Sequence, residues 1–246
     1  MGMNAVEQSV QLRRDLKAEV RRRAEWIAND CSTYWRLRLE QPENLKSLAA
    51  KGIGGGNFVM ALALFSVFNV LSKCYAFLVS PDVFVTEEDG KQVKEAVREL
   101  RTDPKYAALL KNPKTNWRPQ PNGSCNETDA FRVLVKDLLA DQVDLGLPVE
   151  SSGRIWKGFR NQLAHMAHPD GIVQVCRTEH PSPDAKRTIL SSIPKAFLQV
   201  GDRWLCNADR LSIDILDVAD WLGNRIDQCV YEERLVAMKV WLSSSF

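Results

Sequence analysis

The longest apolar segment of the chain, from Phe58 to Val79, is the feature that most limits how the protein can fold. Its uncharged part is about 15 residues long, which is shorter than the roughly 20 residues that a membrane-spanning helix needs. Asn69 and Lys73 also lie within the segment. The segment therefore predicts a buried core helix and no membrane association.

The overall composition agrees with a globular protein, because the 246 residues are 45% hydrophobic and 26% charged. These values exclude a disordered chain. The net charge is only +2, so an argument for nucleic-acid binding depends on local clustering of cations. The N-terminal residues do not resemble a secretion signal and the six cysteines are scattered singly. We therefore expect a cytoplasmic protein with reduced thiols and no bound metal or other cofactor.

Helical periodicity extends over most of the chain. Apolar side chains recur on one helical face over residues 5–40 and again from Asp209 to Val230. A further helix is expected to carry Phe131 to Leu139, and another to span residues 86–101. These patterns predict a bundle of helices.

Two regions depart from the helical pattern. Residues 102–128 hold several prolines and many polar residues, which predicts a long loop. Residues 171–207 contain short strand-like segments, two of them joined by Gly201-Asp202, a pair of the kind that closes a hairpin. We predict one mainly α domain over residues 1–246, with residues 171–207 as a small antiparallel sheet inserted before the last long helix.

The first predicted helix carries a cluster of six cations, which we call the basic cluster: Arg13, Arg14, Lys17, Arg21, Arg22 and Arg23. One interpretation is a solvated helix face with some ion pairs to Asp and Glu one turn away. The other is a surface that faces phosphate groups. The sequence leaves both open.

The segment from Arg154 to His168 has the clearest chemical character of the chain. At about 100° per residue it divides into an apolar arc and a polar face. The apolar arc consists of Ile155, Trp156, Phe159, Leu163 and Met166. The polar face consists of Arg154, Lys157, Asn161, His165 and His168, with Arg160 at its flank.

Such a face could bind an anion and move a proton. Arginine stays cationic and offers a fork of donors to phosphate oxygens, and histidine exchanges a proton near neutral pH. Together they could act on an RNA phosphodiester, whose 2′-OH supplies an internal nucleophile. A simpler explanation is also available, because a His near a helix C-terminus is stabilised by the helix dipole and an exposed Arg is usually just solvated.

The string Arg160-Asn161-Gln162-Leu163-Ala164-His165 resembles the signature of the HEPN superfamily (higher eukaryotes and prokaryotes nucleotide-binding). That signature is an Arg followed by a polar residue, often Asn, and a His a few positions later, on a late helix of an all-α bundle. The resemblance covers the helical part of the chain, residues 5–170 and the final helix. The sheet of residues 171–207 is an elaboration of that pattern.

The resemblance implies a metal-independent endoribonuclease that acts on RNA as a homodimer, with two motifs facing each other across a cleft. By this resemblance Arg160 would stabilise phosphate charge, His165 would transfer protons and Asn161 would orient or assist. Arg154, Lys157 and His168 are candidate RNA contacts outside the signature. It also implies a toxin–antitoxin or phage-defence setting, with an antitoxin protein as a possible partner.

Two other functions stay open at this point. The chain could be a HEPN module without catalysis that binds RNA, a nucleotide or a protein. It could also be a purely structural helical protein, in which Arg160 and His165 share no cleft.

Overall fold

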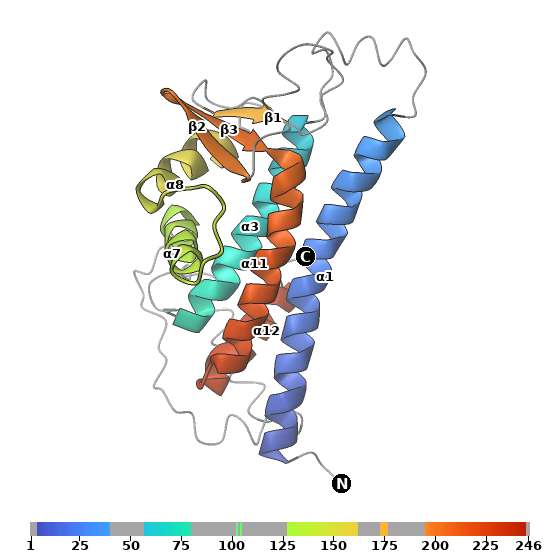
Figure 1. Cartoon of the computed structure of the whole chain (residues 1–246). Coiled ribbons are helices and arrows are strands. Elements are labelled where there is room, and N and C mark those ends of the chain that lie inside the picture. The colour runs from blue at the N-terminus through green and yellow to red at the C-terminus, as the bar shows by residue number, and fades with distance from the viewer. Residues whose placement is uncertain are drawn as a thin grey trace. The chain divides into compact units, whose positions relative to one another are not determined.

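The computed structural model describes residues 4–39, 57–79, 102, 104, 127–161, 173–176 and 195–244 (Figure 1). These residues are mainly helical, and a small sheet precedes the last long helix, which confirms the predicted fold class. The predicted helix 86–101 and nearly all of the predicted loop 102–128 lie outside the described residues. The end of that loop prediction is wrong, because Glu127 and Thr128 form the first turn of α7. The elements are α1 (Ala5–Leu39), α3 (Asn57–Val79), α7 (Glu127–Ala140), α8 (Val149–Ile155), the π-helical η1 (Trp156–Asn161), β1 (Val173–Cys176), β2 (Phe197–Val200), β3 (Arg203–Asn207), α11 (Ala208–Gln228) and α12 (Glu232–Ser244).

The chain groups into two compact units, which are described separately below. Unit 1 consists of Met1–Arg22, Val70–Ala130 and Ala219–Phe246, and unit 2 consists of Arg23–Asn69 and Phe131–Val218. The helices α1, α3, α7 and α11 each contribute to both units. The single domain over residues 1–246 stays a prediction.

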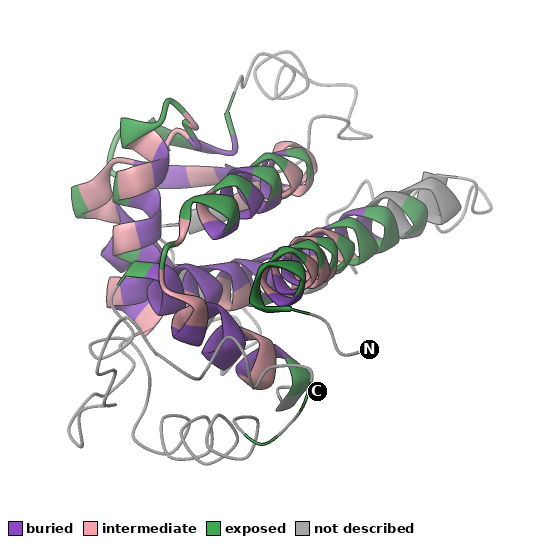
Figure 2. Ribbon diagram, turned by 90° about the horizontal axis from the view of Figure 1, so that it is seen from below, coloured by how far each residue is buried: buried purple, intermediate pink, exposed green. Residues whose placement is uncertain are grey.

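In unit 1, α1 begins with a reciprocal cap. The backbone N–H of Glu7 donates to Asn4 Oδ1 at 3.0 Å, and the N–H of Asn4 donates to Glu7 Oε2 at 2.9 Å, which satisfies two donors at the helix start. Buried residues then recur at every fourth position, including Leu12, Leu16 and Val20. Figure 2 shows these buried positions along one side of α1.

The second half of α3 packs in unit 1 through aromatic contacts with the C-terminal helices. The Tyr75 and Trp221 rings lie 4.9 Å apart, and those of Phe77 and Trp241 lie 5.8 Å apart. The guanidinium of Arg234 donates to the carbonyl of Leu78 at 2.7 Å, which satisfies one of the carbonyls left open at the end of α3.

The α3 helix was the membrane candidate of the sequence. Its residues Met60–Val79 are long and apolar enough for a span by length and composition, but 61% of that window is buried inside the protein. Such burial is typical of a core helix, in agreement with the prediction.

Unit 2 is built around a cluster of aromatic side chains. The Phe65 ring lies 5.9 Å from that of Trp156 and 6.0 Å from that of Phe197, and Phe131 and Trp156 lie 4.6 Å apart. All four side chains are at most 2% exposed. They come from α3, α7, η1 and β2, so the cluster joins the helices of unit 2 to its sheet.

The sheet has the order β1-β3-β2. The predicted hairpin is confirmed: β2 and β3 pair antiparallel with Val200 opposite Arg203, which leaves Gly201-Asp202 as the two-residue turn. Gly201 has φ +64°, as a type II′ turn requires at its first central position. β1 pairs with β3 in parallel, so the sheet is mixed where the sequence predicted an antiparallel one.

The loop between α7 and α8 holds β2 in place. The N–H of Phe197 donates to the carbonyl of Leu145 at 3.0 Å. Gly146, which follows Leu145, has φ +76°, and a Cβ on it would lie 2.2 Å from the carbonyl oxygen of Phe197. Only glycine can bring the loop this close to the strand.

The last long helix ends earlier than its apolar pattern predicted. α11 begins at Ala208, where Asn207 Oδ1 accepts the N–H groups of Asp209 and Arg210 at 3.1 Å each, and ends at Gln228. Val230, which the pattern assigned to the apolar face, is 56% exposed. The break occurs because the chain turns at Cys229–Tyr231 to begin α12.

A buried carboxyl group lies on α11 in unit 2. Asp214 is 3% exposed, and its Oδ1 lies 2.7 Å from Nε of Arg210. Burial raises the pKa of Asp214 to about 6, although the Arg210 guanidinium acts in the opposite direction.

The aromatic cluster gives a first testable prediction. Trp156→Ala should lower the free energy of unfolding by about 3 to 5 kcal/mol, because a fully buried ring would be lost. Trp26→Ala is the matched control, since Trp26 is 62% exposed and its loss should change stability by less than about 1 kcal/mol. Denaturant unfolding measures both, and equal losses would contradict the central place of Trp156.

Asp214 gives a second prediction, on pH. The folded state holds the Asp214 proton up to about pH 6, whereas an unfolded Asp releases it near pH 4. Ionisation of this group therefore destabilises the fold progressively from about pH 4 to pH 6, and fully above that. Asp214→Asn should be more stable than the parent by about 1 to 3 kcal/mol at pH 8 and no more stable at pH 4.

Thermal unfolding of the parent and of Asp214→Asn across this pH range tests the prediction, because other carboxylates titrate alike in both proteins. Asp202→Asn, on the exposed hairpin turn, should show no pH-dependent difference. A stability gap that is the same at pH 4 and pH 8 would contradict the assignment.

Candidate functional site

The segment from Arg154 to His168, which contains the HEPN-like string, begins in α8. The structure describes it as far as Asn161. Ile155 and Trp156 are fully buried, and Arg154 and Lys157 are exposed. At this start of the segment, the predicted apolar arc therefore faces inward and the two predicted RNA contacts face solvent.

A π-helical turn interrupts the continuous α-helix that the sequence predicted. η1 covers Trp156–Asn161, and its i→i+5 hydrogen bonding makes a wider turn than an α-helix. The faces assigned at 100° per residue therefore do not hold from Trp156 to Asn161. Nothing in the spacing of apolar residues signals this turn, because the buried Ile155–Trp156 pair suits both kinds of helix.

The structure places the central motif residues only in part. The backbones of Arg160 and Asn161 belong to η1, while their side chains lie outside what the structure describes. His165 and His168 lie outside the described residues altogether. The predicted grouping of Arg160, Asn161 and His165 therefore stays a prediction.

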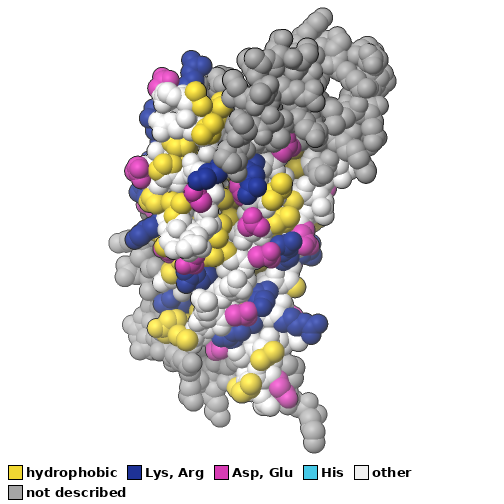
Figure 3. All heavy atoms as spheres, viewed as in Figure 1, with side chains coloured by type: hydrophobic (Ala, Val, Ile, Leu, Met, Phe, Trp, Pro, Cys, Tyr) yellow, Lys and Arg dark blue, Asp and Glu magenta, His cyan; other side chains and the backbone are white. Residues whose placement is uncertain are grey.

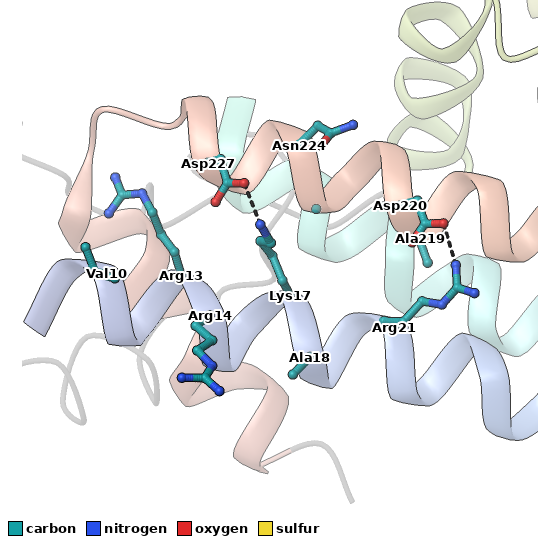
Figure 4. Close-up of a pocket in the computed structure, with 11 residues that line it drawn as sticks. Val10, Arg13, Arg14, Lys17, Ala18, Arg21, Ala219, Asp220, Asn224 and Asp227 are labelled. Carbon is teal, nitrogen blue, oxygen red and sulfur yellow. Dashed lines mark hydrogen bonds and ion pairs between the residues drawn. The ribbon is translucent and has the colours of Figure 1, made fainter.

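Most of the basic cluster is bonded to carboxylates within unit 1. Arg13 contacts Glu232 at 2.9 Å, Lys17 contacts Asp227 at 2.6 Å and Arg21 contacts Asp220 at 2.5 Å. Figure 4 shows Lys17 and Arg21 reaching from α1 to α11. Arg22 pairs locally with Glu19 at 2.8 Å, and this contact raises the pKa of the guanidinium.

These contacts favour the ion-pair interpretation of the basic cluster over the phosphate-facing one. The sequence led us to expect pairs within the helix, but three of these four cations bond to α11 or α12. The acidic residues Asp220 and Asp227 were not among the predicted functional residues. Their spacing with Asn224 at i, i+4 and i+7 is the signal that marks a polar stripe on α11.

A groove of about 700 Å³ lies between α1 and α11 in unit 1. Its α1 wall holds Arg13, Arg14, Lys17 and Arg21, and its α11 wall holds Asp220, Asn224 and Asp227. Small residues shape it: Ala18 is on the first wall, and Ala219 and Gly223 are on the second. The groove thus has one basic and one acidic side (Figure 4).

Arg14 differs from its neighbours in the basic cluster. It is exposed, and among the described residues it forms no hydrogen bond or ion pair. Its donors are therefore not taken up by any described group, and in Figure 4 the side chain points away from α11.

The described residues include no group of three or more His, Cys, Asp or Glu that could hold a metal ion. The chain matches no protein-family model, no curated protein sequence and no solved structure. The resemblance to the HEPN superfamily therefore rests on the motif string itself.

Arg13 gives a third prediction. Its side chain is 17% exposed and its guanidinium also donates to the Cys229 carbonyl at 2.6 Å, so Arg13→Ala should lower the free energy of unfolding by about 1 to 3 kcal/mol. Arg14→Ala is the adjacent control and should have almost no effect. Denaturant unfolding distinguishes them, and a larger loss for Arg14→Ala would contradict the structural role of Arg13.

Proposed function

We propose that the chain is a HEPN-type, metal-independent endoribonuclease. The observation that carries the proposal is the sequence string Arg160-Asn161-x-x-x-His165, whose first two residues end the π-helical turn that begins at the buried Trp156 of a mainly helical protein. The exposed cations Arg154 and Lys157, one turn before the motif, also support it. Neither forms an ion pair with a described residue, so both can contact phosphates of a bound RNA.

The proposed reaction uses the nucleophile that RNA itself contains. The 2′-oxygen attacks the adjacent phosphorus and loses its proton, while the bond from phosphorus to the 5′-oxygen breaks and that oxygen gains a proton. The products are a 2′,3′-cyclic phosphate and a 5′-hydroxyl. In this scheme His165 transfers protons, Arg160 stabilises the negative charge that develops on the phosphate, and Asn161 orients the reacting groups.

The π-helical turn supports a functional role for this segment. Such turns are rare and occur frequently at functional sites, because they displace side chains from the positions of a regular helix. Here the turn includes both Arg160 and Asn161.

The fourth prediction tests the enzymatic proposal directly. Arg160→Ala and His165→Ala should each abolish cleavage of single-stranded RNA in the presence of EDTA, with little change in the thermal unfolding of the protein. His168→Ala and Lys157→Ala should weaken RNA binding and leave the turnover of bound RNA nearly unchanged. Gel analysis of end-labelled RNA, with detection of the cyclic phosphate, measures the reaction.

The matched control is Arg203→Ala, which removes an exposed arginine from β3 and should leave cleavage unchanged. Activity that needs an added divalent metal would contradict the proposal. RNA binding that is sensitive to salt, without any product on long incubation, would support the alternative of a HEPN module that binds but does not cut.

A further inference from the structure

Asp214 differs from the charged side chains at the surface of the protein. On the surface shown in Figure 3, acidic and basic side chains lie side by side in contact with solvent. Asp214 on α11 is instead 3% exposed, and its Oδ2 has no hydrogen-bond partner among the described residues. A buried carboxylate with an unsatisfied oxygen is unfavourable, so this group lowers stability when it is charged.

Asp214 belongs to a set of buried polar contacts that joins α11 to the start of β2 within unit 2. The carbonyl of Ala196, just before β2, accepts the N–H of Asn207 at 2.8 Å. Asn207 Oδ1 accepts the N–H of Arg210 at 3.1 Å, and Nε of Arg210 lies 2.7 Å from Asp214 Oδ1. The backbone N–H of Ala196 also acts on the Asp214 carboxyl group and favours its charged form. We call Ala196, Asn207, Arg210 and Asp214 the α11 junction.

Water has little access to the α11 junction. Ala196 and Asn207 are fully buried, and only the Arg210 side chain, which is 41% exposed, reaches the solvent. A charged Asp214 can therefore become hydrated only if the junction opens.

The charged groups that act on Asp214, among the described residues, both lie on α11. Arg210, one turn before it, favours the carboxylate, and Asp217, one turn after it, opposes the carboxylate. On the strand side, Lys195 bonds to Asp144 instead. Burial outweighs the cation and raises the pKa of Asp214 to about 6, so its charge changes near neutral pH.

The α11 junction is connected to the turn that carries the motif. Phe197 follows Ala196 directly, and its ring lies 6.0 Å from that of Phe65. The Phe65 ring lies 5.9 Å from that of Trp156, which is the first residue of η1. Because a closely packed interior transmits displacements, a shift at Ala196 would reach the start of η1.

We infer that the α11 junction is a pH-sensitive switch between α11 and β2. While Asp214 holds its proton, the buried carboxyl group is neutral and the junction stays closed. When Asp214 releases the proton to water, the charged group is hydrated by local opening of the junction, and β2 and the start of η1 loosen with it. This switch goes beyond the proposed RNA cleavage and does not depend on it.

The alternative is a permanent ion pair between Arg210 and Asp214, which would keep the junction closed at every pH. A buried ion pair is stable only when further hydrogen bonds satisfy the remaining oxygen atoms. Asp214 Oδ2 has no such bond among the described residues, and the Arg210 side chain is partly hydrated. These contacts favour the switch.

The fifth prediction concerns hydrogen exchange of the full chain, measured by mass spectrometry and corrected for the intrinsic effect of pH on exchange. The opening equilibrium constant of residues 196–200 should rise about tenfold from pH 5 to pH 8, because an exposed Asp ionises near pH 4 and Asp214 near pH 6. Exchange of η1 should rise with it. The helix α12, in unit 1, is the internal control and should show no such rise.

Substitutions test whether Asp214 is the group that titrates. Asp214→Asn should abolish the rise. Asp217→Asn should move its midpoint to lower pH and Arg210→Gln to higher pH, because they remove charges of opposite sign beside the carboxyl group. Both change partly exposed residues, so they keep the test available if Asp214→Asn does not fold. Asp202→Asn, on the exposed hairpin turn, is the matched control and should leave the midpoint unchanged.

Three results would each overturn the inference. The first is an opening equilibrium of residues 196–200 that does not change with pH. The second is an equal rise in α12, which would indicate that the whole protein opens. The third is a midpoint that neither Asp217→Asn nor Arg210→Gln moves.

Discussion

The candidate site depends on the packing of the buried Trp156 side chain. Its ring lies against Phe131 and Phe65 in unit 2, and it is the first residue of the π-helical turn that contains Arg160 and Asn161. A buried ring of this kind fixes where the turn begins. The exposed Arg154 and Lys157 on either side of the buried Ile155–Trp156 pair show the same division between packing and solvent.

The basic cluster on α1 shows why a run of cations does not by itself indicate nucleic-acid binding. Its members Arg13, Lys17 and Arg21 bond to carboxylates of α11 and α12, so their charge is balanced within unit 1. Exposed pairs of this kind contribute little to stability individually, but Arg13 also donates to a backbone carbonyl and is largely buried. The cluster therefore acts mainly in joining helices.

Periodicity was enough to predict the helices α1, α3, α7 and α11 and the hairpin turn at Gly201-Asp202, because each depends on local spacing and on burial of one face. The features that were missed depend on contacts distant in sequence. The parallel pairing of β1 with β3 needs a connection of more than twenty residues, and the end of α11 at Gln228 needs the start of α12. The π-helical turn is a third case, since it changes the hydrogen bonding while it leaves the buried residues Ile155 and Trp156 where an α-helix would place them.

The same reasoning separates the kind of site from its arrangement. Residue types and their spacing suggest a kind of chemistry, and the proposal of phosphate chemistry rests on the string from Arg160 to His165. The direction of a side chain depends on helix phase, and a single π-helical turn shifts that phase for every residue after it. On α1, by contrast, no such turn occurs, so the four-residue repeat of Leu12, Leu16 and Val20 carries through. There the phase assigns Arg13 to the ion pairs with the neighbouring helices and Arg14 to solvent, although the two are adjacent and chemically identical.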